Sequence, residues 1–500
     1  MGFQDSAEEQ EGAKAATPSS SSGIRAEMGS TRTKLLYGSG SIAFGVNDQS
    51  FQYFLLPFFN LVVGLPAAWV GIAIAVTMVF DALIDPIVGQ ISDNLRTRLG
   101  RRHPFMYASA VPVAVCYLFL WNPPHWSPVA LFYYLIAIAI LVRTFITFYE
   151  IPSSSLVAEL TPDYHNRTSF FAFRDTFAWV GGLSMALLAY GVFFVTDKAH
   201  PVGQLNPEGY VKYSITGAIV IFAAILASSW GTHRFIPEFK VPAKRAKSIG
   251  ETFSEIFESI SHGSFLVLIL CSLFASVAAG TLTSLTFYFN TYFWHLNSLQ
   301  IFYITLALVP SPFLALASVT PISRALGKRL AAVILWVTST AFYWYPLAAR
   351  MLGAFPGPGS HSLIPLLIVF NTIGVTFSIA CGIVISSMLA DVVEDSELKT
   401  GRRSEGLFFA ARSLVNKAAF GLGAMVASFL LAIVQMPARA DPATLDPAIP
   451  KHLALVYFPT VFVLYAVALI CIGFYRIDRG KHEENLRKLE ASRAAPRAAE

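Results

Sequence analysis

Long apolar stretches, separated by short polar segments, run along almost the whole chain. A helix needs about 20 mainly apolar residues to cross the hydrocarbon core of a bilayer. The pattern therefore predicts an all-α membrane protein with twelve transmembrane helices. The predicted helices lie near residues 37–63, 69–93, 103–122, 128–157, 168–195, 211–232, 264–294, 299–321, 330–351, 363–391, 404–435 and 453–475.

Positive charges are distributed unevenly among the segments that connect these helices. If both termini are cytoplasmic, most loop lysines and arginines fall on the cytoplasmic side, including Arg101, Arg102, Arg234 and Lys328. The opposite loops hold few, such as Lys198. Because an excess of Lys and Arg in short loops marks the cytoplasmic side, we expect a multi-pass protein of the cytoplasmic (inner) membrane with both termini inside.

The two parts of the chain also repeat each other. Ser154-Ser-Leu-Val-Ala-Glu159 matches Ser386-Ser-Met-Leu-Ala-Asp391, and Phe170-Phe-Ala-Phe-Arg174 matches Phe408-Phe-Ala-Ala-Arg412. Transporters are often built from such repeats, with the substrate site near mid-membrane between them. We expect a disordered cytoplasmic tail (1–33), an N-terminal six-helix half (34–232), a cytoplasmic linker (233–263), a C-terminal six-helix half (264–476) and a cytoplasmic tail (477–500).

The amino-acid composition argues against several other classes of function. Only 13% of the residues are charged and 55% are hydrophobic, whereas about a quarter are charged in soluble domains. The net charge of +5 lies in short connectors and indicates no nucleic-acid partner. The four cysteines show no spacing typical of zinc sites or disulfide frameworks. With no P-loop for ATP either, we expect a protein that is not an enzyme and carries no cofactor.

Asp81 and Asp85 interrupt the apolar stretch 69–93 and lie one helical turn apart, on one face. Each carboxylate costs about 2.5–3.5 kcal/mol at a bilayer centre, so we expect both to serve a cation. Oxygen ligands suit Na⁺ or a transported proton, whereas transition metals favour Cys or His. Lys417, the deep charge of the second half, would be the counter-charge. Alternatively, Asp85 caps backbone ahead of Pro86, or both acids form a structural salt bridge with Lys417.

Other charges in the first half are candidates for substrate contact. Glu150 lies two turns from Arg143 along one helix face, and its carboxylate could accept hydrogen bonds from sugar hydroxyls. An ion pair that only packs the bundle is the alternative. Arg174 would either bind substrate or close the cytoplasmic side. We expect Asp48 to contact the substrate as well, and the ring of Trp179 to stack on a sugar.

A short basic loop joins the second and third predicted helices, from Asp93 to Arg102. We interpret it as a determinant of topology and as part of a cytoplasmic latch. Asp93, Arg101, Arg102 and Arg412 are the residues expected in this latch or gate.

One extended motif is specific: Asp81-x-x-x-Asp85-Pro-x-x-Gly89-x-x-Ser-Asp93, followed by Gly100-Arg-Arg-x-Pro104. It resembles the signature of the glycoside–pentoside–hexuronide:cation symporters, a family of the major facilitator superfamily. The resemblance covers residues from about 34 to 476. It implies a major facilitator fold of two pseudo-symmetric six-helix halves that work by alternating access.

The resemblance also implies roles for individual residues. In that family the paired aspartates bind the coupling cation, and they match Asp81 and Asp85. The family's helix-eleven lysine matches Lys417, its sugar-binding acid matches Glu150, and its helix-five arginine matches Arg174. The helix-one sugar-binding aspartate has no clean match, since Asp48 is nearby but Gly45 takes its place in an ungapped register. Ser154 stands where a substrate-stacking tryptophan is expected.

The sequence therefore predicts a monomeric symporter that couples a sugar or glycoside to Na⁺ or H⁺. Its partners would be that small molecule, the coupling cation and the lipid bilayer. A cation-coupled lysolipid symporter of the same fold is the alternative, and a membrane sensor with a vestigial site is a third possibility.

Overall fold

The computed structural model describes residues 27–161, 163–239, 263–400 and 405–475, with a few single positions near 250 and 485. Most of the predicted tails (1–33 and 477–500) and of the linker (233–263) lies outside these residues. The first half contains α2 (Thr31–Ser39), α3 (Ser41–Gln49), η1 (Ser50–Phe54), α4 (Leu55–Pro57), η2 (Phe58–Val63), α5 (Ala67–Asn94), α6 (His103–Trp121), α7 (Pro128–Leu160), α8 (Tyr164–Leu188), η3 (Ala189–Phe193), η4 (Gly203–Leu205), α9 (Pro207–His233) and η5 (Ile236–Glu238).

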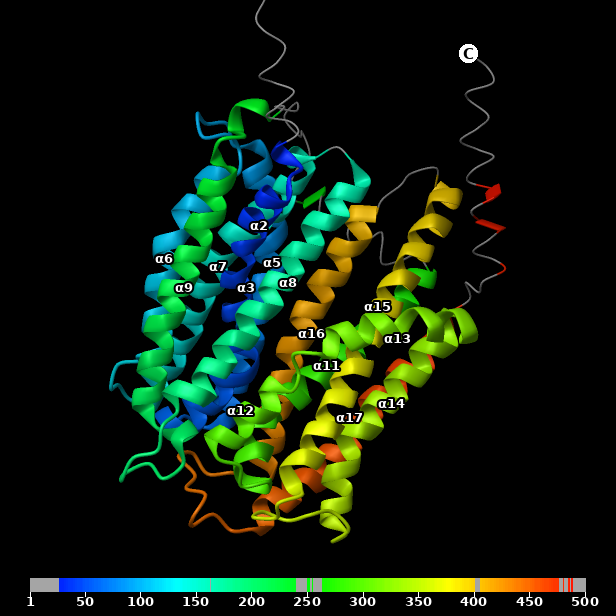
Figure 1. The fold of residues 1–500 in the computed structure, drawn as a ribbon. Coiled ribbons are helices and arrows are strands. Elements are labelled where there is room, and N and C mark those ends of the chain that lie inside the picture. Colours follow the sequence, from blue (N-terminus) through cyan, green and yellow to red (C-terminus); the bar gives the residue numbers. More distant parts are fainter. Residues whose placement is uncertain are drawn as a thin grey trace, which may run out of the picture.

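The second half is helical in the same way (Figure 1). Its elements are α11 (Gly263–Tyr288), η6 (Phe289–Phe293), α12 (Ser298–Leu306), α13 (Ser311–Leu326), α14 (Lys328–Met351), α15 (Leu363–Thr400), α16 (Glu405–Ile433) and α17 (Ala448–Gly473).

Eleven helical segments among the described residues are long and apolar enough to cross a membrane, and one of them, Ser298–Leu326, consists of α12 and α13 together. The remaining predicted span, residues 37–63, is helical too but is divided by the π-helical turns η1 and η2. Pro57, which lies between these turns, lacks the N–H that would continue the regular helix. Gly64 ends the segment in a left-handed conformation, with φ of 98°. The predicted all-helical membrane fold is confirmed.

Residues at the helix starts explain where several spans begin. Ser127 accepts a hydrogen bond from the amide of Ala130 and precedes Pro128, the first residue of α7. Asn206 accepts one from the amide of Glu208 before Pro207 opens α9. A side-chain oxygen before the helix satisfies an otherwise unpaired amide, and proline has no amide to leave unpaired. These local signals explain why α7 and α9 begin at Pro128 and Pro207.

The predicted repeat between the halves recurs in three dimensions. Glu159, at the end of α7, forms ion pairs with Arg101 at 2.5 Å and with Arg102 at 2.8 Å. Its counterpart Asp391 pairs with Lys328 at 2.6 Å. Because Arg101 follows Gly100 and Lys328 follows Gly327, each half ties the start of its third long helix to its fourth in the same way.

The aromatic part of the repeat behaves likewise. Phe170 and Phe408 are both buried, and each meets a ring from the first long helix of its own half. The ring centroid of Phe170 lies 5.4 Å from that of Tyr37, and Phe408 lies 4.5 Å from Phe265, both edge to face. This agreement supports two related halves, although the residue limits proposed for them stay a prediction.

Helices α5 and α16 pack against each other across the boundary between the halves. Small residues permit the approach: a Cβ on Gly71 would lie 1.8 Å from Ser428 Oγ, and one on Gly421 would lie 2.5 Å from Met78 Cβ. Such contacts are typical of close helix packing in membranes. This seam carries Asp81 and Asp85 on one side and Lys417 on the other.

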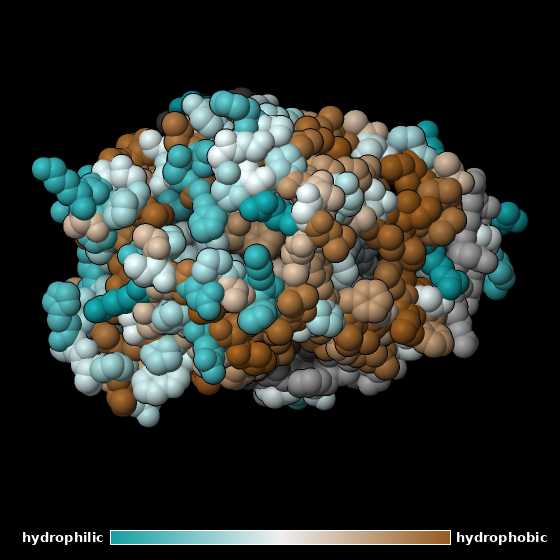
Figure 2. Space-filling model, turned by 90° about the horizontal axis from the view of Figure 1, so that it is seen from below, coloured by the Kyte–Doolittle hydropathy of each residue, from teal (hydrophilic) through white to brown (hydrophobic). Residues whose placement is uncertain are grey.

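The start of α2 and the end of α17 lie toward the same end of the helix bundle (Figure 1). Figure 2 views the opposite end, where hydrophilic residues gather mainly on the left and hydrophobic residues on the right. At this end the halves meet through Gln204, which is fully buried. Its Nε2 donates to the carbonyl of Leu296 at 2.9 Å, and Ser298 Oγ donates to its Oε1 at 2.9 Å.

Candidate transport site

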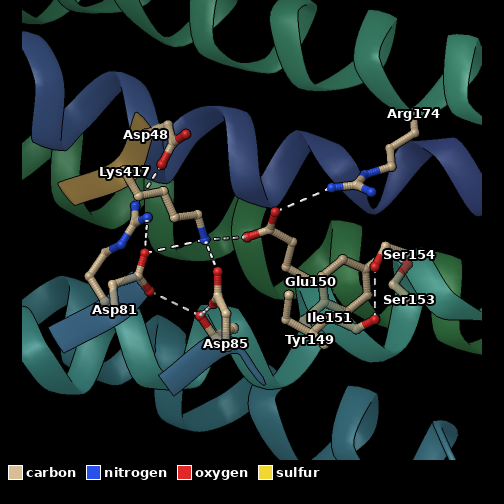
Figure 3. Close-up of polar contacts among 12 residues, drawn as sticks. Asp48, Asp81, Asp85, Tyr149, Glu150, Ile151, Ser153, Ser154, Arg174 and Lys417 are labelled. Atoms are coloured by element: carbon tan, nitrogen blue, oxygen red, sulfur yellow. Dashed lines mark hydrogen bonds and ion pairs between the residues drawn. The ribbon is translucent and has the colours of Figure 1, made fainter. Parts of the chain in front are cut away.

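Lys417 reaches from the C-terminal half into three carboxylates of the N-terminal half (Figure 3). Its Nζ lies 2.7 Å from Asp85 Oδ2, 3.3 Å from Asp81 Oδ2 and 3.7 Å from Glu150 Oε2. The sequence placed this lysine near the paired aspartates, and the structure brings all of them together. The single ammonium group is therefore within ion-pair distance of all three acids at once.

Arg143 of α7 is the second base of the cluster, with a side chain only 2% exposed. It donates from one terminal nitrogen to Asp48 Oδ1 and from the other to Asp81 Oδ2, both at 2.6 Å. The alternative considered for Glu150 was an ion pair with Arg143, but Arg143 pairs with Asp48 and Asp81, and Glu150 pairs with Arg174 and Lys417. One guanidinium thus connects α3, α5 and α7, and charge-assisted bonds of this length are strong.

Thr147 completes the surroundings of the aspartates and is a residue that the sequence analysis missed. Its hydroxyl lies 3.0 Å from Asp81 Oδ1 and 3.1 Å from Asp85 Oδ1. Because a hydroxyl carries one proton, it donates to one carboxylate at a time. Its position four residues after Arg143 on α7 was an available signal, since residues at this spacing share a helix face.

Glu150 and Arg174 form the edge of the same cluster. Arg174, from α8, donates to Glu150 Oε1 at 3.2 Å. The other oxygen, Oε2, is buried and has no hydrogen-bond partner. This carboxylate is therefore less fully satisfied than Asp81, which accepts from Arg143 and Thr147.

The charges of the cluster do not balance when all groups are ionised. Four acids, Asp48, Asp81, Asp85 and Glu150, are paired with three bases, Arg143, Arg174 and Lys417. Buried charges are tolerated only when they are paired and hydrogen-bonded. One net negative charge therefore remains, which a single additional positive charge would neutralise.

A cavity of about 520 Å³ lies between the two halves. Asp48 lines it and is the one charged side chain among the described residues of its wall. The wall also contains amides, hydroxyls and aromatic rings from both halves, including Gln49, Gln52, Tyr53, Trp179, Thr283, Asn290, Phe342, Tyr343, Asn371 and Tyr457. Since Asp48 also accepts from Arg143, this side chain joins the cavity to the ion cluster.

The structure separates the residues expected to bind substrate into two groups. Asp48 and Trp179 line the cavity, whereas Glu150 and Arg174 belong to the ion cluster and are not part of its described wall. The amides at Gln52, Asn290 and Asn371 were missed. Their signal was a polar side chain within an apolar run, but only the rotation of each helix decides whether it faces a cavity.

The residues expected in a cytoplasmic latch also fall into two places. Arg102 joins Asp93 at 2.7 Å and Glu159 at 2.8 Å, and Arg101 joins Glu159 at 2.5 Å, all within the N-terminal half. Arg412 lies in the C-terminal half and donates to Ser386 Oγ at 3.0 Å. The latch role of these residues stays a prediction, and the structure adds Glu159 to it.

Two helical halves with a buried ion cluster and a cavity between them define a membrane transporter of the major facilitator type. The fold of the nucleoside transporter NupG is similar, with a TM-score of 0.58, 13% identity, and coverage of 89% of this chain and 99% of that one. The chain belongs to the family described as MFS/sugar transport protein, whose model matches residues 36–479. This places it among transporters rather than enzymes.

Three relatives that resemble this chain in sequence carry the names of transporters. A protein of Synechocystis sp. named "uncharacterized symporter sll1374" is 26% identical, with 94% of this chain and 98% of that protein covered. The isoprimeverose transporter of Lactiplantibacillus pentosus is 24% identical, with 89% and 88% covered. The sphingosine-1-phosphate transporter MFSD2B of Mus musculus is 25% identical, with 88% of each chain covered.

Proposed function

We propose that this protein is a secondary transporter that couples the movement of a sugar or glycoside to that of a monovalent cation, Na⁺ or H⁺. The observation that carries this proposal is the position of Asp48, which faces the cavity and shares Arg143 with Asp81. The protein would act as a monomer in the cytoplasmic membrane with both termini inside.

The chemistry of the cavity wall supports a polyhydroxylated, uncharged substrate. Amide and hydroxyl groups donate and accept hydrogen bonds to sugar hydroxyls, and the rings of Trp179 and Tyr343 offer apolar faces. A volume of about 520 Å³ is within the range of small-molecule sites. A carboxylate such as Asp48 accepts from hydroxyl groups more strongly than a neutral oxygen does.

The cluster supports a link between the substrate and a cation. A substrate hydroxyl that donates to Asp48 would share this carboxylate with Arg143, and Arg143 in turn holds Asp81. In our proposal, Asp81 and Asp85 receive the cation and Lys417 is the counter-charge. Coupling between two such sites typically amounts to about 1–3 kcal/mol and is reciprocal.

A lysolipid is the second candidate, because a relative named as a sphingosine-1-phosphate transporter matches most of this chain. A phosphate headgroup is normally recognised by Arg or Lys, often through paired hydrogen bonds. The described wall of the cavity offers the opposite charge, that of Asp48. The wall therefore favours a sugar over a phosphate-bearing lipid.

Counterflow in proteoliposomes tests the proposal. A panel of labelled neutral sugars and disaccharides, and a lysophospholipid, would be offered with and without a sodium or pH gradient. We expect exchange of a neutral sugar and at least a tenfold loss in apparent affinity for Asp48→Asn, because hydrogen bonds to charged groups contribute about 1.5–3 kcal/mol. Exchange of the lysolipid alone would contradict the sugar assignment, and binding without flux would indicate a sensor.

The matched control is Glu208→Gln, which removes an exposed carboxylate from the first turn of α9. It makes the same chemical change as Asp48→Asn but lies outside the cavity wall. Normal exchange by this variant would show that the loss in Asp48→Asn depends on position rather than on net charge.

A further inference from the structure

The two aspartates proposed to receive the cation, Asp81 and Asp85, already accept hydrogen bonds from donors of the protein itself. Asp81 is fully buried; its Oδ2 accepts from Arg143 at 2.6 Å and lies 3.3 Å from Lys417 Nζ, and its Oδ1 accepts from Thr147 at 3.0 Å. Asp85 Oδ2 accepts from Lys417 at 2.7 Å. A hard cation needs several oxygen ligands at short distance, so a sodium ion would have to displace these donors.

The two bases differ in how easily they could be displaced. Lys417 is 15% exposed and is shared among three acids, so its ammonium group has alternative partners. Arg143 is 2% exposed and is held by Asp48 and Asp81 at the same time. Its guanidinium also lies over the ring of Phe51, 5.5 Å from the centroid. Arginine stays protonated inside proteins, so this charge is permanent.

We propose that Arg143 is a tethered cation that stands in for a sodium ion at Asp81, the member of the aspartate pair that it contacts, and thereby excludes sodium from this transporter. The consequence of this inference for transport rests on the proposed function. Sodium binding itself can be measured whether or not the protein transports a sugar. Like charges a few ångströms apart repel strongly in a buried site. A sodium ion beside Asp81 would therefore face both the guanidinium and the loss of its ligand.

The same geometry shows what removal of Arg143 would create. Thr147 Oγ1 lies within 3.1 Å of an oxygen of each aspartate, so three oxygen-bearing side chains already converge. Without the guanidinium, Asp81 Oδ2 would lose its shortest partner and the cluster would carry a further unbalanced negative charge. A small neutral residue at position 143 would thus leave both ligands and space for a sodium ion.

Equilibrium dialysis with ²²Na⁺ on the purified, full-length protein in choline buffer tests the inference. We expect no saturable sodium binding to the wild-type protein and saturable binding to Arg143→Ala. Arg143→Lys, which keeps a tethered charge, should resemble the wild type. Arg98→Ala is the matched control, because Arg98 is an exposed arginine in the loop after α5. In a double variant, Asp81→Asn should abolish the binding that Arg143→Ala creates.

A merely structural role for Arg143 would predict loss of the folded protein but not the gain of an ion site. Saturable sodium binding to the wild type that disappears in Asp81→Asn would overturn the inference. So would a well-folded Arg143→Ala protein that binds no sodium. If Arg143→Ala fails to fold, the wild-type measurement decides alone. The absence of transport for every sugar would instead contradict the proposed function, since the dialysis contains no sugar.

Discussion

Lys417 provides the sharpest test of the ion cluster, because it is the base through which the C-terminal half meets three acids of the other half. Lys417→Met keeps most of the side-chain volume but removes the charge. Asp85 and Glu150 then lose their ammonium partner, whereas Asp81 keeps Arg143. The described cluster would change from one net negative charge to two.

The expected loss of stability in Lys417→Met follows from the burial of the acids that lose their partner. Removing one partner of a buried ion pair typically costs about 3–5 kcal/mol. Asp85 and Glu150 are 16% and 10% exposed, so water reaches them slightly. We therefore expect Lys417→Met to lower the free energy of unfolding by about 3 kcal/mol, the low end of this range. This corresponds to roughly two orders of magnitude in the folding equilibrium constant. Adding Asp85→Asn removes the excess charge and should recover most of that loss.

Unfolding of the purified protein by SDS in mixed micelles, followed by circular dichroism, measures both variants against the wild type. The control is Lys212→Met, which makes the same change at an exposed position on α9. A Lys417→Met protein as stable as this control would refute the idea that the acids depend on Lys417. If Lys417→Met/Asp85→Asn were less stable than Lys417→Met alone, excess negative charge in the cluster could not be the cause of the instability.

Two further predictions concern the contact between the halves. Gln204→Ala removes the hydrogen bonds with Leu296 and Ser298, each contributing about 0.5–1.5 kcal/mol. Because these bonds join the halves, we expect greater labelling of a cysteine placed in the cavity by a membrane-impermeant maleimide. Unchanged labelling would contradict the idea that Gln204 holds the halves together at this end. Gly71→Val would drive a side chain into Ser428, because a Cβ there lies 1.8 Å from its Oγ. It should lower the free energy of unfolding by about 1–3 kcal/mol, measured by the same SDS unfolding. Gly263→Val is the control, since no atom of the described residues lies within 4 Å of its Cβ position.

The charged members of the site were accessible from the sequence because charge in an apolar helix is costly and therefore conspicuous. Asp81, Asp85, Glu150 and Lys417 were selected for this reason, and the structure brings them together. The ion pairs of Glu159 and Asp391 were not predicted, although their repeat was. A repeat indicates equivalent positions, but it does not say which residues meet there.

By itself, the sequence determined the all-helical membrane fold and its two repeated parts, since hydrophobic periodicity and burial in lipid depend on residues close in the chain. Only the tertiary structure decided that Arg143 binds Asp48 and Asp81, and that Asp48 faces a cavity whereas Glu150 does not. These facts depend on the relative rotation of α3, α5 and α7. That rotation is set by packing among residues far apart in the chain, which no local pattern encodes.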